Sequence, residues 1–107
     1  MIKIYKYELK LDLSVQTGGG YALATVELPA NARILHYHAQ DYSACLWAEV
    51  DVEADHTETH RYAVVPTGVE APDPSEGWVY VGTIHMHGGT FVWHLYHNDD
   101  CLNTEMN

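Results

Sequence analysis

The sequence predicts an all-β fold, a single small antiparallel β-sandwich or barrel-like meander of about seven strands with little or no helix. Three observations support this prediction. Val, Ile, Thr, Tyr and Trp are concentrated in short runs, as they are in strands. Clusters of glycine, proline and acidic residues separate the runs. Several runs alternate apolar and polar residues, which is typical of strands with one buried face.

The clearest element is a hairpin over residues 78–97, WVYVGTIHMHGGTFVWHLYH. Gly88-Gly89 suits the turn, because glycine adopts a positive φ without steric cost. This turn predicts that Ile84 faces Trp93 and that Thr83 faces His94. The core face is expected to carry Tyr80, Ile84, Met86, Phe91, Trp93 and Leu95. The other face is expected to carry Val79, Val81, Thr83, His85, His87, Thr90, Val92, His94 and Tyr96.

The first strand is predicted over residues 2–13, where apolar and polar residues alternate cleanly. The glycine-rich turn at 14–20 leads into a second strand at 21–28, and the two are expected to pair as a hairpin. Residues 59–65 form a further short strand, which ends at Pro66. Residues 66–77, PTGVEAPDPSEG, form the one long loop before the hairpin.

A second hairpin is predicted from strands at 33–39 and 43–52, with its turn at Asp41-Tyr42. Its apolar face is expected to carry Leu35, Tyr37, Ala39, Ala44, Leu46, Ala48 and Val50. Its opposite face is expected to carry Ile34, His36, His38, Cys45, Trp47 and Glu49. Residues 1–97 should therefore form one β domain, since 107 residues suit a single core, and residues 98–107 a polar C-terminal tail.

Charge and hydropathy exclude several classes of partner. Fifteen acidic and five basic residues give a net charge of −10, which disfavours direct contact with nucleic acid or an anionic membrane. No apolar run approaches the ~20 residues needed to span a bilayer. The alternating start, MIKIYKYELK, does not resemble a secretory signal, so an intracellular protein is expected.

Four segments together resemble a family of short proteins encoded by tailed bacteriophages: LPANARIL (28–35), CLWAEVD (45–51), YVGT (80–83) and GGTFVWHLY (88–96). The resemblance covers roughly residues 1–97. It implies a phage accessory gene product that acts in the cytoplasm of the bacterial host, in a family without an assigned activity. The histidine pairs at 36/38 and 85/87 lie outside the family's pattern.

Eight histidines are the strongest oddity of the composition. Two His-x-His pairs, at 36/38 and 85/87, each place both imidazoles on one face of a strand. A zinc site would need further ligands from another strand, such as Cys45 beside the second pair. Neither pair is followed by the glutamate that cupin sites use. We therefore predict no metal and no cofactor, and interpret these faces as a contact surface made of His85, His87, Val92, His94, Tyr96, His36, His38 and Trp47.

Catalytic motifs are absent from the sequence: no glycine-rich loop joins a strand to a helix, and no serine lies in a nucleophile elbow. A dyad of Cys45 with His36 or His38 is disfavoured, because a cysteine within a strand more often serves packing. No catalytic residue is predicted, and the chain is not expected to be an enzyme.

The functional prediction is a non-enzymatic phage accessory binding protein that inhibits a host defence system by occupying a basic partner surface. An acidic surface supports it, made of Glu49, Asp51, Glu53, Asp55, Glu58, Glu70, Asp73 and Glu76. One alternative is a sponge that sequesters a small host metabolite or signalling nucleotide. Another is a metal enzyme with histidine ligands. The aromatic hairpins and small size also predict a homo-oligomer.

Overall fold

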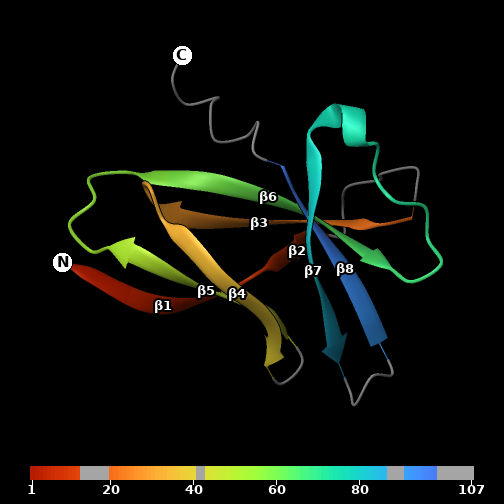
Figure 1. Cartoon of the computed structure of the whole chain (residues 1–107), viewed down its shortest axis with the longest axis horizontal. Helices are drawn as coiled ribbons and strands as arrows, with labels where there is room; N and C mark the ends of the chain where they lie inside the picture. Colours follow the sequence, from red (N-terminus) through yellow and green to blue (C-terminus); the bar gives the residue numbers. More distant parts are fainter. Residues whose placement is uncertain (13–19, 41–42, 87–90, 99–107) are drawn as a thin grey trace.

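The computed structural model describes residues 1–12, 20–40, 43–86 and 91–98. These residues form eight strands and a short 3-10 helix, and every strand ladder is antiparallel, so the all-β prediction is confirmed (Figure 1). The elements are β1 (Ile2–Glu8), β2 (Lys10–Asp12), β3 (Ala22–Pro29), β4 (Arg33–Gln40), β5 (Ser43–Asp51), β6 (Thr57–Pro66), η1 (Pro74–Glu76), β7 (Trp78–Met86) and β8 (Phe91–Asn98). No helix in this part of the chain has the length and apolar character to cross a membrane.

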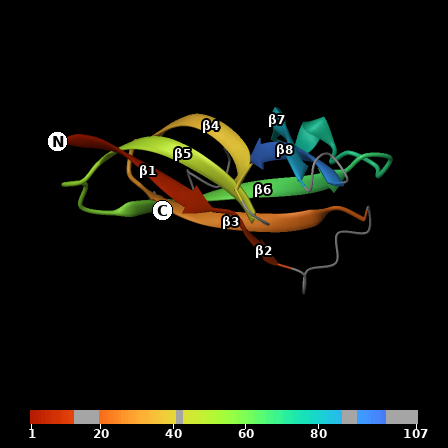
Figure 2. The ribbon, with the colours of Figure 1, turned by 90° about the horizontal axis from the view of Figure 1, so that it is seen from below.

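The strands form two sheets, one in the order β1-β5-β4 and the other in the order β2-β3-β6-β8-β7. β1 belongs to the first sheet and β2 to the second, and β2 directly follows β1 in the chain. The two sheets are therefore joined where β1 passes into β2. The eight strands therefore follow one another around an incomplete barrel. At the opposite side β7 lies against β4, but these two strands belong to different sheets and share no ladder. Figure 2 shows the three-stranded sheet stacked over β3 and β6.

The first predicted strand is divided at Leu9. The backbone N–H of Leu9 donates to the carbonyl oxygen of Ala44 at 2.9 Å, and its side chain is buried. Lys10–Asp12 pair with β3 as predicted, whereas Ile2–Glu8 pair with β5, so the prediction of one continuous hairpin over 2–28 was wrong. Alternation could not reveal this change, because the inward-facing side chains stay on one side while the backbone changes neighbours.

The main core lies between the two sheets. Its buried members are Leu9, Ala24, Val26, Leu28, Leu46, Ala48, Val50, Tyr62, Val64, Ile84 and Leu95. A second, smaller cluster lies on the outer side of the five-stranded sheet, where Ala63, Val65 and Trp78 are buried. Val69, from the segment between β6 and β7, packs against this cluster. The long loop therefore covers part of the sheet's outer face.

The hairpin of β7 and β8 has the predicted register near its turn, with Thr83 opposite His94 and Ile84 opposite Trp93. The predicted turn at Gly88-Gly89 lies outside the described residues. Towards Trp78 the register shifts between Tyr80 and Gly82, which is a β-bulge. A bulge inserts one residue and exchanges the faces beyond it. Tyr80 is consequently 54% exposed and Val81 packs against the core, so their predicted faces were wrong.

A second bulge changes the hairpin of β4 and β5. Its register at the turn end is as predicted, with Ala39 opposite Ala44, but it shifts between Ile34 and His36. Ile34 packs against the main core and Leu35 is 41% exposed, which reverses the prediction for both residues. Beyond the bulge, His36 and His38 stay on the outer face with Trp47, as predicted.

The bulge in β7 predicts a large contrast between two of its residues. Ile84→Ala should cost about 2–5 kcal/mol of unfolding free energy, because a fully buried side chain is removed and leaves a cavity. Tyr80→Ala should cost about 1 kcal/mol, because that ring lies largely in solvent. Urea unfolding of both variants measures the difference. A cost at Tyr80 as large as that at Ile84 would contradict the bulge.

Candidate functional site

The first group of predicted contact residues lies together on the outer face of the three-stranded sheet. His36 and His38 come from β4 and stack at 5.8 Å between ring centroids. His36 also lies opposite Trp47 of β5, with ring centroids 6.2 Å apart. Both histidines are exposed and the indole is half-buried. The three rings therefore form a short aromatic row.

The second group lies on the outer side of the five-stranded sheet. His85 is exposed and faces Val92 across the hairpin, while His87 lies outside the described residues. Two hydrogen bonds hold His94: its Nδ1 shares one with the hydroxyl of Thr83 at 3.0 Å, and its Nε2 shares one with the hydroxyl of Thr67 at 2.8 Å.

Tyr96, the last member of this group, is also held in place. It packs against the second apolar cluster and lies edge-on to Tyr80 at 5.7 Å between ring centroids. His94 and Tyr96 therefore stabilise the local structure, whereas His85 is the exposed histidine among the described members of the group.

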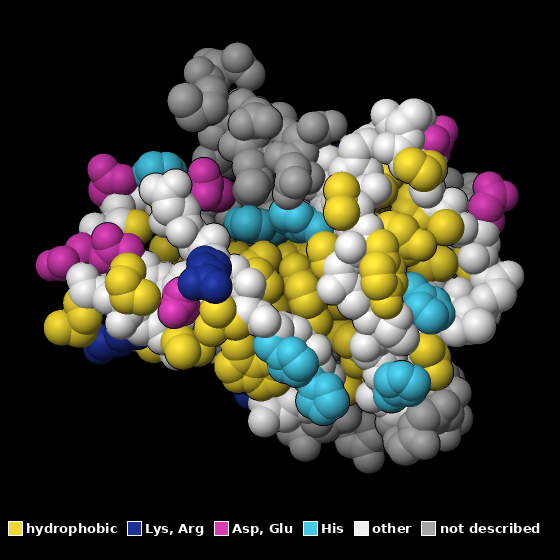
Figure 3. Space-filling view, in the orientation of Figure 1, with side chains coloured by type: hydrophobic (Ala, Val, Ile, Leu, Met, Phe, Trp, Pro, Cys, Tyr) yellow, Lys and Arg dark blue, Asp and Glu magenta, His cyan; other side chains and the backbone are white. Residues whose placement is uncertain are grey.

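A groove lies between β4 and β7, and we call it the β4–β7 groove. It has a volume of about 520 Å³ and is lined by Ile34, Leu35, His36, Tyr37, Val81, Gly82 and Thr83. Figure 3 shows a hydrophobic hollow here, with histidine side chains over β4 on one side and over β7 and β8 on the other. One wall of the groove carries His36. The other carries Thr83, whose hydroxyl shares a hydrogen bond with His94.

Gly82 contributes to the groove by its lack of a side chain. A Cβ added there would lie 3.9 Å from Cδ2 of Tyr37, which is an ordinary van der Waals contact. The Cβ of an alanine would therefore fit at this position, and a larger side chain would extend from it beside Tyr37.

A buried polar row lies behind the groove. The hydroxyls of Tyr37 and Tyr62 share a hydrogen bond of 2.9 Å, and the ring of Tyr62 lies 4.9 Å from that of His97. His97 Nε2 and His60 Nδ1 are in turn 3.0 Å apart. One of these two nitrogens must donate and the other accept, so the accepting nitrogen carries no hydrogen. The row links the two sheets, because Tyr37 belongs to one and the other three residues to the other.

Sequence reasoning did not include His60 and His97 among the important residues. A signal was nevertheless present, because His60 shares its strand face with Tyr62 and Val64. Likewise, His97 shares its face with Leu95, which was assigned to the core. Alternation therefore places both histidines inward, and the structure buries them at 4% and 9% exposure.

The predicted acidic surface forms two patches. Glu49, Asp51, Glu53, Asp55 and Glu58 lie around the turn between β5 and β6, and Glu70, Asp73 and Glu76 lie between β6 and β7. Figure 3 shows these carboxylates at the two ends of the face that carries the groove.

Local hydrogen bonds lower the pKa of several of these carboxyl groups. The backbone N–H of Glu53 lowers the pKa of Asp51, and the nearby N-terminal ammonium adds to the effect. The bond with His56 lowers the pKa of Asp55, and the N–H of Ser75 lowers that of Asp73. Both patches are therefore negative at neutral pH.

The groove offers apolar walls with an imidazole and a hydroxyl at its rim. This composition suits contact with an apolar side chain that has polar neighbours. Within the described residues, no group of three His, Cys, Asp or Glu side chains is placed to hold a metal ion. Cys45 is buried, with its thiol 3.9 Å from the carbonyl oxygen of Ser43.

The Tyr37–Tyr62 bond predicts a measurable coupling between the sheets. A double-mutant cycle with Tyr37→Phe and Tyr62→Phe should give a coupling free energy of about 0.5–1.5 kcal/mol, the usual net value of one hydrogen bond. Chemical denaturation of the four proteins measures it, and the cycle cancels effects that each hydroxyl has separately. Additive costs would show that the two hydroxyls do not interact.

Comparison with known proteins identifies the family of the chain. No curated protein and no solved structure matches it. The family described as Domain of unknown function (DUF7352) matches residues 1–103, a range that takes in all the described strands and both walls of the β4–β7 groove. The chain therefore belongs to this family of domains of unknown function.

Proposed function

We propose that this protein is a non-enzymatic binding protein that acts by occupying the surface of a partner, and that the β4–β7 groove is its contact region. The observation that carries the proposal is the position of the groove between two acidic patches on one face (Figure 3). An apolar hollow can receive a side chain of the partner, and the carboxylates around it attract a partner of opposite charge.

The charge of the chain supports a partner with a basic surface. Ten negative charges in excess raise the rate of encounter with a cationic surface and disfavour anionic ones. Complementary charge at the rim mainly provides orientation and speed, whereas the desolvated centre provides most of the binding energy. A partner of this kind would present an apolar side chain surrounded by lysine or arginine.

The biological setting forms part of the proposal. The resemblance of four sequence segments to short tailed-bacteriophage proteins supports an accessory protein that acts in the cytoplasm of the bacterial host. We propose that its partner there belongs to a host defence system. A small rigid protein that covers a working surface inhibits by exclusion, which needs no catalytic group.

A pull-down from bacterial lysate tests the proposal. Gly82→Leu should fill the groove and abolish capture of the partner that the wild-type protein retains. Val79→Leu is the matched control, because Val79 lies on the same strand, is 53% exposed and does not line the groove. The thermal midpoint of each variant checks that it is folded before its capture is compared with that of the wild type. Equal capture by Gly82→Leu would refute the groove as the contact region.

Electrostatic recognition predicts that binding depends on pH. The ordinary pKa of histidine is about 6.5, so acidification to pH 5 adds positive charge to a chain that contains eight histidines. If all eight histidines gained a proton, the net charge of −10 would become −2. Affinity for the basic partner should therefore fall between pH 7 and pH 5, as titration calorimetry can measure. Unchanged affinity over this range would argue against charge-driven binding.

We also propose that the protein forms a homodimer through β1. This strand lies at the edge of the three-stranded sheet, and its side chains Ile2, Ile4 and Tyr5 are exposed at 62%, 57% and 45%. An exposed edge with apolar residues can pair with another strand. A second copy would supply that strand with two-fold symmetry.

Sedimentation equilibrium tests this assembly. The wild type should be dimeric at tens of micromolar, and Ile4→Lys should shift it towards monomer by adding like charges at the paired edge. Val79→Lys changes a residue of similar exposure, 53% against 57% for Ile4, on the edge of the other sheet and should leave the dimer intact. A wild-type monomer at high micromolar concentration would disprove the dimer.

A further inference from the structure

Two buried imidazoles lie side by side in the five-stranded sheet, and neither lines the β4–β7 groove. They are His60 of β6 and His97 of β8, which we call the histidine pair; their exposed fractions are 4% and 9%. Their rings stack at 5.2 Å between centroids, and His60 Nδ1 lies 3.0 Å from His97 Nε2. This is the distance of a hydrogen bond, so protonation of one ring affects the other.

The hydrogen bond limits the number of protons that the histidine pair can hold. In the neutral pair one nitrogen donates and the other accepts, and a proton added to the far nitrogen of the donor ring keeps this arrangement. When both rings are protonated every ring nitrogen is a donor, so two N–H groups would face each other across 3.0 Å. Burial also disfavours the charged form of each ring. The folded pair therefore excludes at least one proton that two imidazoles in water would bind.

The side chains around the histidine pair include one carboxylate and two phenols. Glu58 and Tyr62 share the face of His60 on β6, and the Glu58 carboxylate accepts a hydrogen bond from the backbone N–H of Asn31 at 3.1 Å. Tyr37 of β4 faces the pair from the other sheet through the hydroxyl of Tyr62. The neighbours on the remaining strands carry no titratable group: Val26 of β3 opposite His60, Val79 of β7 opposite His97, and Leu95 on the same face of β8.

The guanidinium nearest to the pair in the sequence lies on the opposite face of the sheet. Arg61 is next to His60, but its side chain lies over the ring of Trp78, 5.7 Å from the centroid. Trp78 belongs to the smaller apolar cluster on the outer side of this sheet. The described surroundings of the pair thus contain a carboxylate that is already hydrogen-bonded and a cation that points away.

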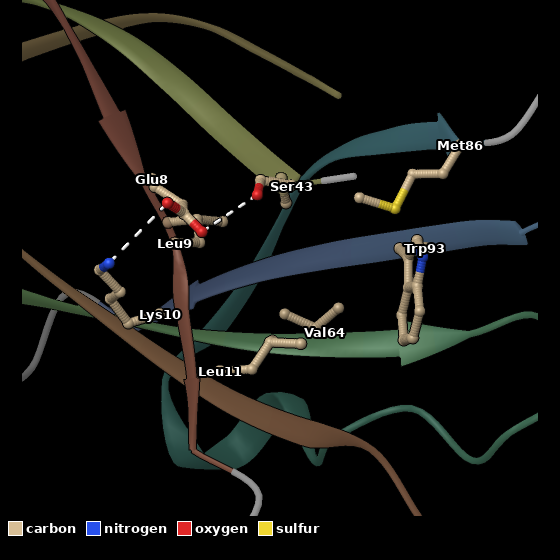
Figure 4. A pocket seen from close by; sticks show the side chains of 9 residues that line it. Glu8, Leu9, Lys10, Leu11, Ser43, Val64, Met86 and Trp93 are labelled. Carbon is tan, nitrogen blue, oxygen red and sulfur yellow. Dashed lines mark hydrogen bonds and ion pairs between the residues drawn. The ribbon is translucent and has the colours of Figure 1, made fainter. Parts of the chain in front are cut away.

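The corner where β1 passes into β2 provides a second junction between the sheets, and its side chains include no imidazole. Figure 4 shows Glu8 there, 3.8 Å from the ammonium of Lys10 and accepting a hydrogen bond from Ser43 at 3.0 Å. Val64 and Trp93 also line this corner, each four residues along its strand from a member of the histidine pair. Protonation of the pair therefore acts at one end of β6 and β8, and the corner is an internal reference.

We propose that the histidine pair is an acid-sensitive switch at its end of the five-stranded sheet. At neutral pH the shared hydrogen bond holds β6 and β8 together there, and protonation of both rings breaks the bond and opens this end. The opening reaches the β4–β7 groove, because Tyr62 packs against His97 and shares a hydrogen bond with Tyr37, which lines the groove. This last consequence rests on the function proposed above, whereas the opening itself is a property of the free protein.

Amide side chains that cannot be protonated test the switch. In His60→Asn the side-chain amide replaces Nδ1, and in His97→Gln it replaces Nε2, so the double variant keeps a neutral pair that can form a hydrogen bond. The unfolded wild type binds more protons than the folded one, so its unfolding free energy falls as the pH is lowered. Each excluded proton should favour unfolding about 30-fold between pH 7.5 and pH 5, given an ordinary histidine pKa of about 6.5.

Urea unfolding of the free protein at the two pH values measures this effect. The wild type should lose at least about 30-fold in its folding equilibrium constant, and the double amide variant should lose about 30-fold less. The matched control, His36→Asn with His38→Gln, removes two exposed imidazoles and should keep the loss of the wild type. An equal loss in the wild type and the double amide variant would overturn the proposal.

Amide hydrogen exchange of the wild type locates the opening and does not require any variant to fold. After correction for the intrinsic effect of pH on exchange, residues 60–62 and 95–97 should lose protection at pH 5. Leu9, whose N–H donates to Ala44, and residues 44–46 at the corner should keep theirs. Equal loss at both places, or no loss at the histidine pair, would overturn the proposal. Both experiments use the free protein, so their outcome does not depend on whether the groove binds a partner.

Discussion

The N-terminal segment 2–12 forms β1 in one sheet and β2 in the other, and the rest of the structure depends on this connection. Up to Glu8 it pairs with β5, and from Lys10 it pairs with β3. The sheets are therefore joined by covalent chain on one side of the barrel. On the other side, β4 and β7 meet without a ladder. The groove lies at this open seam, so the candidate site follows from the same topology.

Side-chain contacts connect the two sheets at the seam, where no backbone ladder joins β4 and β7. Tyr37 lies close to Gly82, and its hydroxyl shares a hydrogen bond with the hydroxyl of Tyr62. The polar row continues through His97 to His60. Buried polar groups of this kind need every partner in place, because a lost hydrogen bond leaves an uncompensated polar atom in the core. Specific hydrogen bonds thus position the two edges of the seam, while β4 and β7 remain the edge strands of their sheets.

Local patterns predicted the elements, the hairpin registers near their turns and the outward position of His36, His38 and Trp47. The two bulges were not predictable, because one inserted residue reverses the alternation without changing the composition. The faces predicted for Tyr80 and Leu35 were therefore wrong. The buried histidine pair was missed for a different reason. Alternation places both histidines inward, but it does not reveal that they pair, because His60 and His97 are 37 residues apart.

Amide hydrogen exchange of the free protein and of its complex with the captured partner tests the role of the seam most directly. We expect slower exchange in the complex at residues 34–37 of β4 and 81–83 of β7, the two walls of the groove. Slower exchange limited to the outer faces of the sheets or to the turn between β5 and β6, with no change at either edge of the seam, would contradict this account.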